Sequence, residues 1–398
     1  MIFNTIRCFT FSKKYVFNCL IDLFCRVYIC LPSFRILSKI IFTVTNDLSY
    51  DQRMHRIAGS LAEAGYAVLL IGRKLKDSVP LKPQPFQQKR LKCFFTRGLL
   101  FYAEYNLRLF FFLLFQQAEI ICAIDLDTIL PVYFVTAVKN KKRVYDAHEL
   151  FTEQKEVISR PAIHSIWLSI EKFTVPKYKM GYTVNGFIAG ELLKRYGVNY
   201  EVIRNLPRLS PKVEDNFESK EKWLIYQGAV NKGRCFETLI PAMKKVNATL
   251  LICGKGNFFE QVKELIKQNK LESKVELRGY VSPDELAVLT PNAYLGITLF
   301  EPEGMNQYYS LSNRFFDYIM AGIPQVCVNY PEYAAINKQY NIAYLIDDTQ
   351  THTIANALNN LIENDVLYQE LKGNSEKARL VLNWEKEKQF LLDFYQGL

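Results

Sequence analysis

The sequence lacks the cysteine patterns that stabilise small secreted domains or hold structural metal ions. Its 398 residues contain nine cysteines, an odd number, and no two of them form a CxxC pair. None of the four histidines lies near a cysteine at a spacing typical of zinc sites. We therefore expect free thiols in a reducing, cytoplasmic compartment, with neither a disulfide framework nor a bound metal.

Long hydrophobic runs are absent as well. Residues 1–38 are rich in Phe, Ile, Leu and Cys, but charged side chains interrupt them, and uncharged stretches such as 15–21 are short. A membrane-spanning helix needs roughly 20 apolar residues, and no small-residue cleavage site of a signal peptide follows. Two interpretations of residues 1–38 remain open. They form either a cationic amphipathic segment on a membrane surface or an extension ahead of the first domain.

Acidic residues are too few to balance the basic ones. The formal net charge is +10 and the isoelectric point is about 9.0. A basic surface attracts nucleic acid, anionic lipid or phosphorylated ligands. The chain shows no recognisable nucleic-acid-binding module, so we expect no nucleic-acid partner.

The length and the order of hydrophobic segments predict two α/β domains. A strand at 40–45, a helix at 53–64 and a strand at 66–71 form a βαβ unit, which is typical of a doubly wound parallel sheet. Residues 76–92, rich in Pro, Gln and Lys, are predicted to be a loop. We assign residues 39–208 to this first domain.

The same alternation returns after a polar linker at 208–221. We assign residues 209–384 to a second domain and residues 385–398 to a C-terminal helix that packs back toward the first. Two Rossmann-like domains joined in this way face each other across a cleft. Ligands bind at the carboxyl ends of the strands in such sheets.

The segment 310–324 carries the strongest chemical signal. A polar loop containing Ser310 and Ser312 opens a helix, and free N–H groups at a helix start can hold a diphosphate. Arg314 and Asp317 share one face of that helix. The cation suits phosphate oxygens and the carboxylate suits a ribose diol. The alternative is an ordinary amphipathic helix with two solvated charges.

This segment, SLSNRFFDYIMAGIP, resembles the SLPNK…FEY..AG.P signature of family-4 retaining glycosyltransferases. The resemblance implies a GT-B fold, with Asp317 on the donor ribose and Ser312, Asn313 and Arg314 at the phosphates. The chain departs from the family where Asp317 replaces a glutamate and where Tyr309 occupies the position of an upstream acid. Glu301 or Glu303 is the candidate to approach the donor sugar instead.

Two further segments of the second domain resemble the same family. The run YQGAVNKGR at 226–234 is similar to its YQG…RG.E loop, which implies that Arg234, or secondarily Lys232, neutralises the leaving diphosphate. A surface arginine is the alternative. Gly228 belongs to this loop, and Gly254 belongs to a turn similar to the family's strand–GxG turn, so the resemblance implies that both glycines bind the donor. On its own a GxG indicates only a tight bend.

In the first domain, YDAHEL at 145–150 resembles the family's YD.HE motif, which implies that His148 contacts the donor sugar near the reacting carbon. Asp51 and Arg53 follow the first strand and are predicted to face the acceptor. Asp125 and Asp127 follow another strand, and we favour a helix-capping role for them over catalysis.

Together these patterns predict a metal-independent, cofactor-free retaining glycosyltransferase. Its expected substrates are a nucleotide-diphosphate sugar and a sugar or lipid-linked acceptor in cell-surface polysaccharide or glycolipid synthesis. Two alternatives are a GT-B nucleotide-sugar epimerase and a non-catalytic relative. Residues 90–115, aromatic and basic, form either a surface for an anionic membrane or a buried helix. The first possibility would make the protein peripheral at the inner face of the membrane.

Overall fold

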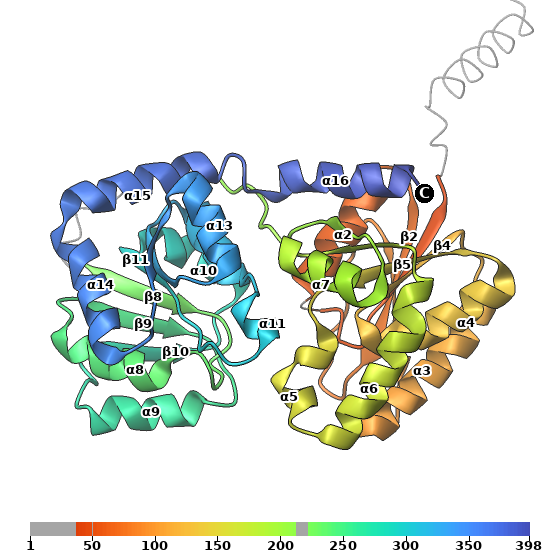
Figure 1. Cartoon of the computed structure of the whole chain (residues 1–398), viewed down its shortest axis with the longest axis horizontal. Helices are drawn as coiled ribbons and strands as arrows, with labels where there is room; N and C mark the ends of the chain where they lie inside the picture. Colours follow the sequence, from red (N-terminus) through yellow and green to blue (C-terminus); the bar gives the residue numbers. More distant parts are fainter. Residues whose placement is uncertain (1–36, 50, 212–221) are drawn as a thin grey trace, which may run out of the picture.

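The computed structural model describes residues 37–49, 51–211 and 222–398. The predicted N-terminal extension, up to residue 36, and most of the predicted linker, 212–221, lie outside the described residues. Figure 1 shows two lobes side by side, each built on a twisted sheet with helices on both faces.

The first lobe contains a seven-stranded parallel sheet in the order β3-β2-β1-β4-β5-β6-β7. Its central strands are almost wholly apolar because helices cover both faces. The strands are β1 (Lys39–Thr43), β2 (Ala67–Lys74), β3 (Gln87–Lys92), β4 (Ile120–Ile124), β5 (Lys142–Ala147), β6 (Met180–Thr183) and β7 (Glu201–Val202). The helices are α2 (Gln52–Glu63), α3 (Gly98–Leu114), α4 (Ile129–Lys139), α5 (Lys155–Ile158), α6 (Pro161–Thr174) and α7 (Gly186–Tyr196).

The second lobe contains a six-stranded parallel sheet in the order β10-β9-β8-β11-β12-β13. Its strands are β8 (Trp223–Gln227), β9 (Thr249–Cys253), β10 (Val275–Gly279), β11 (Leu295–Thr298), β12 (Gln325–Val328) and β13 (Ala343–Ile346). Its helices are α8 (Phe236–Ala242), α9 (Phe259–Gln268), α10 (Pro283–Leu289), α11 (Met305–Tyr308), α12 (Asn313–Ala321), α13 (Pro331–Tyr340), α14 (Thr351–Glu363) and α15 (Asp365–Ala378).

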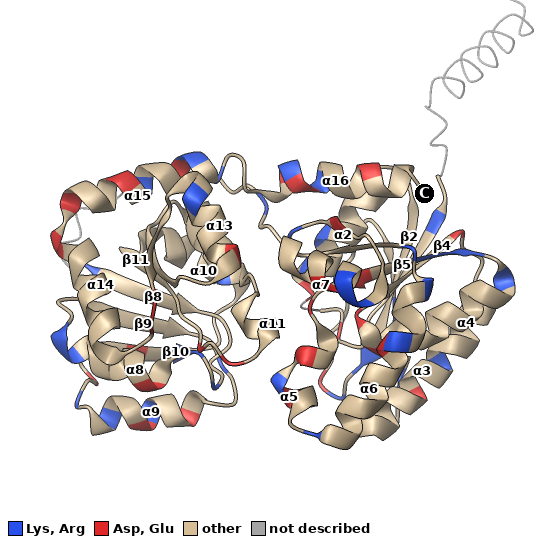
Figure 2. Cartoon of the chain, in the orientation of Figure 1, with Lys and Arg blue, Asp and Glu red and all other residues tan. Residues whose placement is uncertain are grey.

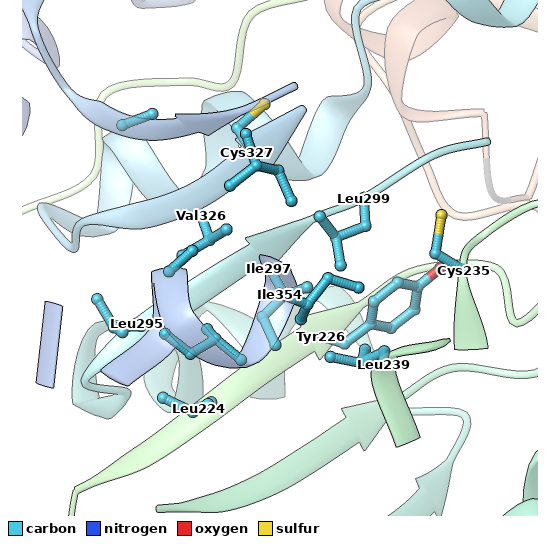
Figure 3. Close-up of a cluster of buried hydrophobic side chains, with 14 of the residues drawn as sticks. Leu224, Tyr226, Cys235, Leu239, Leu295, Ile297, Leu299, Val326, Cys327 and Ile354 are labelled. Atoms are coloured by element: carbon cyan, nitrogen blue, oxygen red, sulfur yellow. The ribbon is translucent and has the colours of Figure 1, made fainter. Parts of the chain in front are cut away.

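Each lobe has its own hydrophobic core. Figure 3 shows part of the second, where Leu224, Ile297 and Val326 project from neighbouring strands toward Leu239 and Ile354 of the covering helices. The five cysteines in the described part of the chain are all free thiols. The predicted α/β fold with two Rossmann-like domains is confirmed.

The last helix, α16 (Trp384–Gln396), crosses from the second lobe to the first (Figure 1). Its first residue is fully buried in the first lobe, where Trp384 Nε1 donates a hydrogen bond to Ser60 Oγ at 2.9 Å. At its other end, Tyr395 packs among Phe42, Tyr66 and Tyr182. Helix α16 therefore packs on the first lobe along its length.

The prediction of a loop over 76–92 is wrong for its last part. Residues 87–92 form β3, which pairs with β2 only and lies at the edge of the sheet. Edge strands commonly carry charged side chains, so QQKRLK lacks the hydrophobic alternation that indicates a strand in sequence. The neighbouring strand β2 also continues through Gly72 to Lys74, where the sequence predicted its end.

Candidate functional site

A cavity of about 440 Å³ opens at the carboxyl ends of the second sheet. This is the edge at which open α/β sheets bind ligands. It is lined by the end of β8, the loop before α12, the start of α12 and one residue of the first lobe. The lining residues are Glu149, Gln227, Gly228, Ala229, Arg234, Leu286, Phe300, Asn306, Gln307, Ser310, Leu311, Ser312, Asn313, Arg314 and Asp317.

Two arginines of this cavity have no acidic partner within ion-pair distance in the described part of the chain. The Arg314 guanidinium, 6% exposed, lies 4.2 Å from the ring centre of Tyr226 and 5.0 Å from that of Phe300. The Arg234 guanidinium lies 4.4 Å from the ring centre of Phe300. Burial and the charge of Arg314 lower the pKa of Arg234 from its ordinary value. Two cations held close together without a counter-ion favour an anionic ligand.

Three buried polar side-chain atoms in the cavity lining lack a hydrogen-bond partner: Arg234 Nε, Arg314 Nη1 and Ser312 Oγ. Buried polar atoms are nearly always paired in folded proteins. Ser312 precedes the first residue of α12, and its side chain does not cap that helix. A helix N-terminus beside two arginines and a free hydroxyl is suited to a phosphate or diphosphate group.

Asp317 lies about one turn after the start of α12, and the side-chain amide of Gln227 holds its carboxylate in place. Gln227 Nε2 donates to the Asp317 carboxylate at 3.0 Å, and Thr290 Oγ1 donates to Gln227 Oε1 at 2.6 Å. Burial raises the pKa of Asp317 to about 6, although Gln227, Arg56 and Arg314 oppose the shift. The carboxylate thus faces the cavity in a fixed orientation.

The two glycines of the predicted site have different roles. Gly228, with φ +118°, lines the cavity, and a side chain there would reach within 3.9 Å of the Arg314 guanidinium. Gly254 does not line it. A Cβ at Gly254 would lie 1.8 Å from the Gly228 carbonyl oxygen, so this glycine is required where the β8 and β9 loops touch.

The first lobe contributes a buried charge cluster around His148 at the end of β5. His148 Nε2 lies 2.9 Å from Arg53 Nε and 3.1 Å from Asp146 Oδ2, and the other ring nitrogen lies 3.5 Å from Asp125 Oδ2. Burial lowers the pKa of His148, but Asp146 and Asp125 outweigh burial and Arg53, and the pKa rises to about 9.

Asp125 does not cap a helix, contrary to the sequence-based preference. Its Oδ1 accepts the backbone N–H of His148 at 2.9 Å, and it makes no side-chain capping bond. Its backbone has φ 53° and ψ 176°, a region that costs a non-glycine residue about 1–3 kcal/mol and occurs mainly at functional sites. Asp127 likewise accepts a hydrogen bond from Thr45 instead of capping.

The two lobes touch beside the cavity. Asn306, in α11, donates to Glu149 at 2.7 Å and accepts from the backbone N–H of Leu150 at 3.2 Å. Tyr309 stacks on Phe187 of the first lobe with ring centres 3.3 Å apart. The cavity is therefore closed on one side by the first lobe.

Residues 211–378 match the family described as Glycosyl transferases group 1. The chain is a glycosyltransferase of the GT-B type. The match covers the lobe that contains the cavity and both unpaired arginines. It does not favour the epimerase alternative.

Solved structures share this fold over most of their length. Sucrose-phosphate synthase from Thermosynechococcus elongatus superimposes with a TM-score of 0.76 at 17% identity, covering 91% of this chain and 99% of that one. HepE from Anabaena, in complex with UDP-glucose, superimposes with a TM-score of 0.70 at 12% identity, covering 91% of this chain and 100% of that one. WaaG, a glycosyltransferase involved in lipopolysaccharide biosynthesis, superimposes with a TM-score of 0.66 at 14% identity, covering 88% of this chain and 98% of that one. A comparison with curated protein sequences found no match.

The glycosyltransferase fold brings together only some of the residues predicted from sequence. Besides Gly254, two of the predicted donor-binding residues lie outside the cavity lining: Lys232 is exposed, and Glu303 is exposed and paired with Lys155. On the predicted acceptor side, Asp51 caps α2, and Arg53 is buried with donors to Asp146, His148 and the Ile203 carbonyl.

The cavity also contains residues that the sequence did not single out. Glu149 follows His148 in the YD.HE motif, so its position was a signal that it could reach the same cleft. Gln227 follows Tyr226 at the end of β8, where side chains of a parallel sheet reach a ligand. Asn306 lies in the one-turn helix α11, which has no recognisable sequence pattern.

Proposed function

We propose that this glycosyltransferase moves a sugar from a nucleoside diphosphate sugar to an acceptor with retention of anomeric configuration. The observation that carries the proposal is a pair of arginines that line the cavity without an acidic partner within ion-pair distance: Arg314, which is buried, and Arg234, which is half-buried. The leaving nucleoside diphosphate gains negative charge as the glycosidic bond breaks, and fixed cations stabilise that charge.

The remaining residues are assigned by position. Asp317 accepts hydrogen bonds from the donor ribose, and Ser312, Asn313 and the start of α12 hold the diphosphate. His148, which follows the end of β5, contacts the donor sugar. Because the arginines and the helix N-terminus supply positive charge, we propose that transfer requires no metal ion.

Retention is proposed to proceed by attack on the face from which the diphosphate leaves. The bond between the anomeric carbon and the phosphate oxygen breaks, and the acceptor oxygen forms the new bond. The departing phosphate oxygen takes the acceptor's proton. Glu149 is the acid that lines the cavity from the first lobe, and its carboxylate is already bound by Asn306 and Gln154, which argues against a covalent nucleophile.

The proposed donor class is supported by the HepE complexes, which contain UDP-glucose, or UDP and glucose. For the acceptor we propose a sugar or a lipid-linked sugar of a cell-surface polysaccharide or glycolipid. WaaG, with the same fold, is described as acting in lipopolysaccharide biosynthesis. The proposed location is the cytoplasm, at the inner face of the membrane.

The arginine pair provides the test. Arg314→Ala and Arg234→Ala are each expected to weaken nucleoside diphosphate binding about 10- to 100-fold, as for a lost charge-assisted contact of roughly 1.5–3 kcal/mol. Thermal shift with UDP, GDP, ADP and dTDP identifies the base, because a ligand of the folded state raises the melting temperature. Isothermal titration then measures the affinity of each variant.

The matched control is Arg278→Ala, which removes an exposed arginine that is paired with Glu276 on β10. It should bind nucleotide as the parent does. Donor turnover should survive chelation by EDTA. Unchanged nucleotide affinity in both cavity variants would refute the proposed site, and loss of turnover with EDTA would refute metal independence.

A further inference from the structure

The first lobe carries an unusual concentration of exposed apolar side chains on one layer of helices. Helix α3 packs against α4, and α4 packs against α6. In Figure 1 these helices lie next to each other along the bottom and the right side of the lobe, with α4 furthest from the second lobe. Half of the exposed large apolar side chains in the described part of the chain lie on these helices or directly beside α3.

Helix α3 shows why this layer is not an ordinary covering layer. One face is buried against the sheet and bears Phe101, Tyr105, Leu109 and Leu113. A soluble surface helix has polar residues on its opposite face. Here the opposite face presents Leu100, Leu107 and Phe111, all exposed.

The apolar character continues beyond the faces of α3. Phe94, before the helix, is 85% exposed, and Phe115, after it, is 84% exposed. On α4, Val138 is 76% exposed and Phe134 is also exposed. On α6, Ile166 and Phe173 are exposed too. Large exposed apolar surfaces are uncommon on monomeric soluble proteins and mark interaction sites.

The charges at the margin of this patch are predominantly positive. Lys177 Nζ lies 3.7 Å from the ring centre of Phe173, and the Arg108 guanidinium lies 5.1 Å from that of Phe94. Of the two acids on α3 and α6, Glu171 is buried and bonded to Thr152, and Glu104 is paired with Arg108. Figure 2 shows long tan stretches on α4 and α6, with blue segments near the helix ends.

We propose that the outer face of α3, α4 and α6 docks on a bilayer containing anionic lipids. Apolar and aromatic side chains enter the interfacial region, and the cations at the margin contact lipid phosphates. The charge favours a bilayer over a second copy of this chain, because two identical basic faces repel each other. The inference rests on the proposed function: the lobe that docks is the one that bears His148, so a lipid-linked acceptor would reach the cleft from the membrane.

Vesicle flotation of the full-length chain tests the surface. The variant Leu107→Glu/Phe111→Glu/Val138→Glu places three carboxylates on the patch. We expect it to bind phosphatidylcholine vesicles containing phosphatidylglycerol about tenfold less than the parent, or weaker still. The parent should bind pure phosphatidylcholine vesicles much less.

The matched control uses three exposed apolar side chains elsewhere in the chain, in the variant Val288→Glu/Val366→Glu/Leu380→Glu. It adds the same charge and should float like the parent. Melting temperature and nucleoside diphosphate binding, measured on both variants, show that the fold and the donor site are intact. A failure of the proposed function appears in nucleotide binding and not in flotation.

Three outcomes would overturn the proposal. Equal flotation of parent and patch variant would assign membrane binding to another surface or to residues 1–36. Equal binding to neutral and anionic vesicles would remove the role of charge. A parent that is dimeric in solution and becomes monomeric in the patch variant would assign the face to a second copy of the chain.

Discussion

The position of the His148 imidazole is fixed in part by Asp125, which lies twenty-three positions earlier in the chain. Asp125 adopts a strained backbone and accepts the His148 N–H, so its carboxylate is held beside the imidazole. The strain is consistent with a residue selected to position another. Asp125 is therefore better described as a positioning residue than as a helix cap.

Replacing Asp125 by Asn is expected to lower the pKa of His148, which is about 9 in the parent. A neighbouring carboxylate stabilises the imidazolium, so its loss should lower this pKa by about 1–3 units. A group with a raised folded-state pKa keeps its proton until the pH passes that value. The loss of activity at high pH should therefore begin at lower pH in Asp125→Asn.

The titration can be followed by NMR, because the chain has only four histidines. The His148 ring signal is assigned by its absence in His148→Gln. Asp77→Asn, at an exposed position, is the control and should leave the titration unchanged. An unchanged His148 pKa in Asp125→Asn would show that the carboxylate does not act on the imidazole.

At the scale of elements, the short helix α11 connects the lobes. Its Asn306 is hydrogen-bonded to Glu149 and to the Leu150 backbone, and the neighbouring Gln307 binds the carbonyls of Gly233 and Glu301. This helix thus holds the arginine-bearing loop of the second lobe and touches the end of β5 in the first. Movement of α11 would change both halves of the site.

Asn306→Ala should release the first lobe from α11. It removes both hydrogen bonds, each worth about 0.5–1.5 kcal/mol. Amide hydrogen exchange should accelerate in peptides covering residues 148–153 and 304–309, because local opening becomes easier. Asn292→Ala, which removes only a bond to the Val288 carbonyl, is the control. Identical exchange in the parent and Asn306→Ala would contradict the bridging role.

Across the whole molecule, α16 fastens the end of the chain to the first lobe. Trp384 is 1% exposed, donates to Ser60, and its backbone N–H binds the Pro207 carbonyl next to the lobe connection. The second lobe is therefore joined to the first by two chain crossings. These crossings limit how far the lobes can separate.

Trp384→Ala should destabilise the first lobe by about 3–5 kcal/mol, the range for removing a buried aromatic side chain. Calorimetry or denaturant unfolding measures the loss. Phe390→Ala on the same helix, where the side chain is 58% exposed, should have little effect. If both variants are equally stable, α16 does not contribute to the packing of this lobe.

Much of the fold could be predicted from the sequence because its signals are local. The β-branched run at 40–43 and the apolar run at 120–124 indicate buried strands wherever they stand in the sheet. The polar strand β3 carried no such signal, because its identity depends on pairing with β2. Residues 90–115 left two alternatives open, and α3 combines elements of both, with one face buried and the other exposed.

The sequence by itself determined the two parallel sheets and the helix that begins after Ser312, and it singled out Arg234 and Arg314 as candidate cations. Hydrophobic periodicity and the residues typical of a helix start depend only on residues that are neighbours in the sequence. Only the tertiary structure decided which of these side chains share a cavity. Arg234 and Arg314 are eighty positions apart, and Glu149 and Asn306 still further. Their proximity follows from strand order and lobe contact, which no local pattern encodes. The same contacts leave Lys232 and Glu303 outside the cavity and turn Asp125 toward His148.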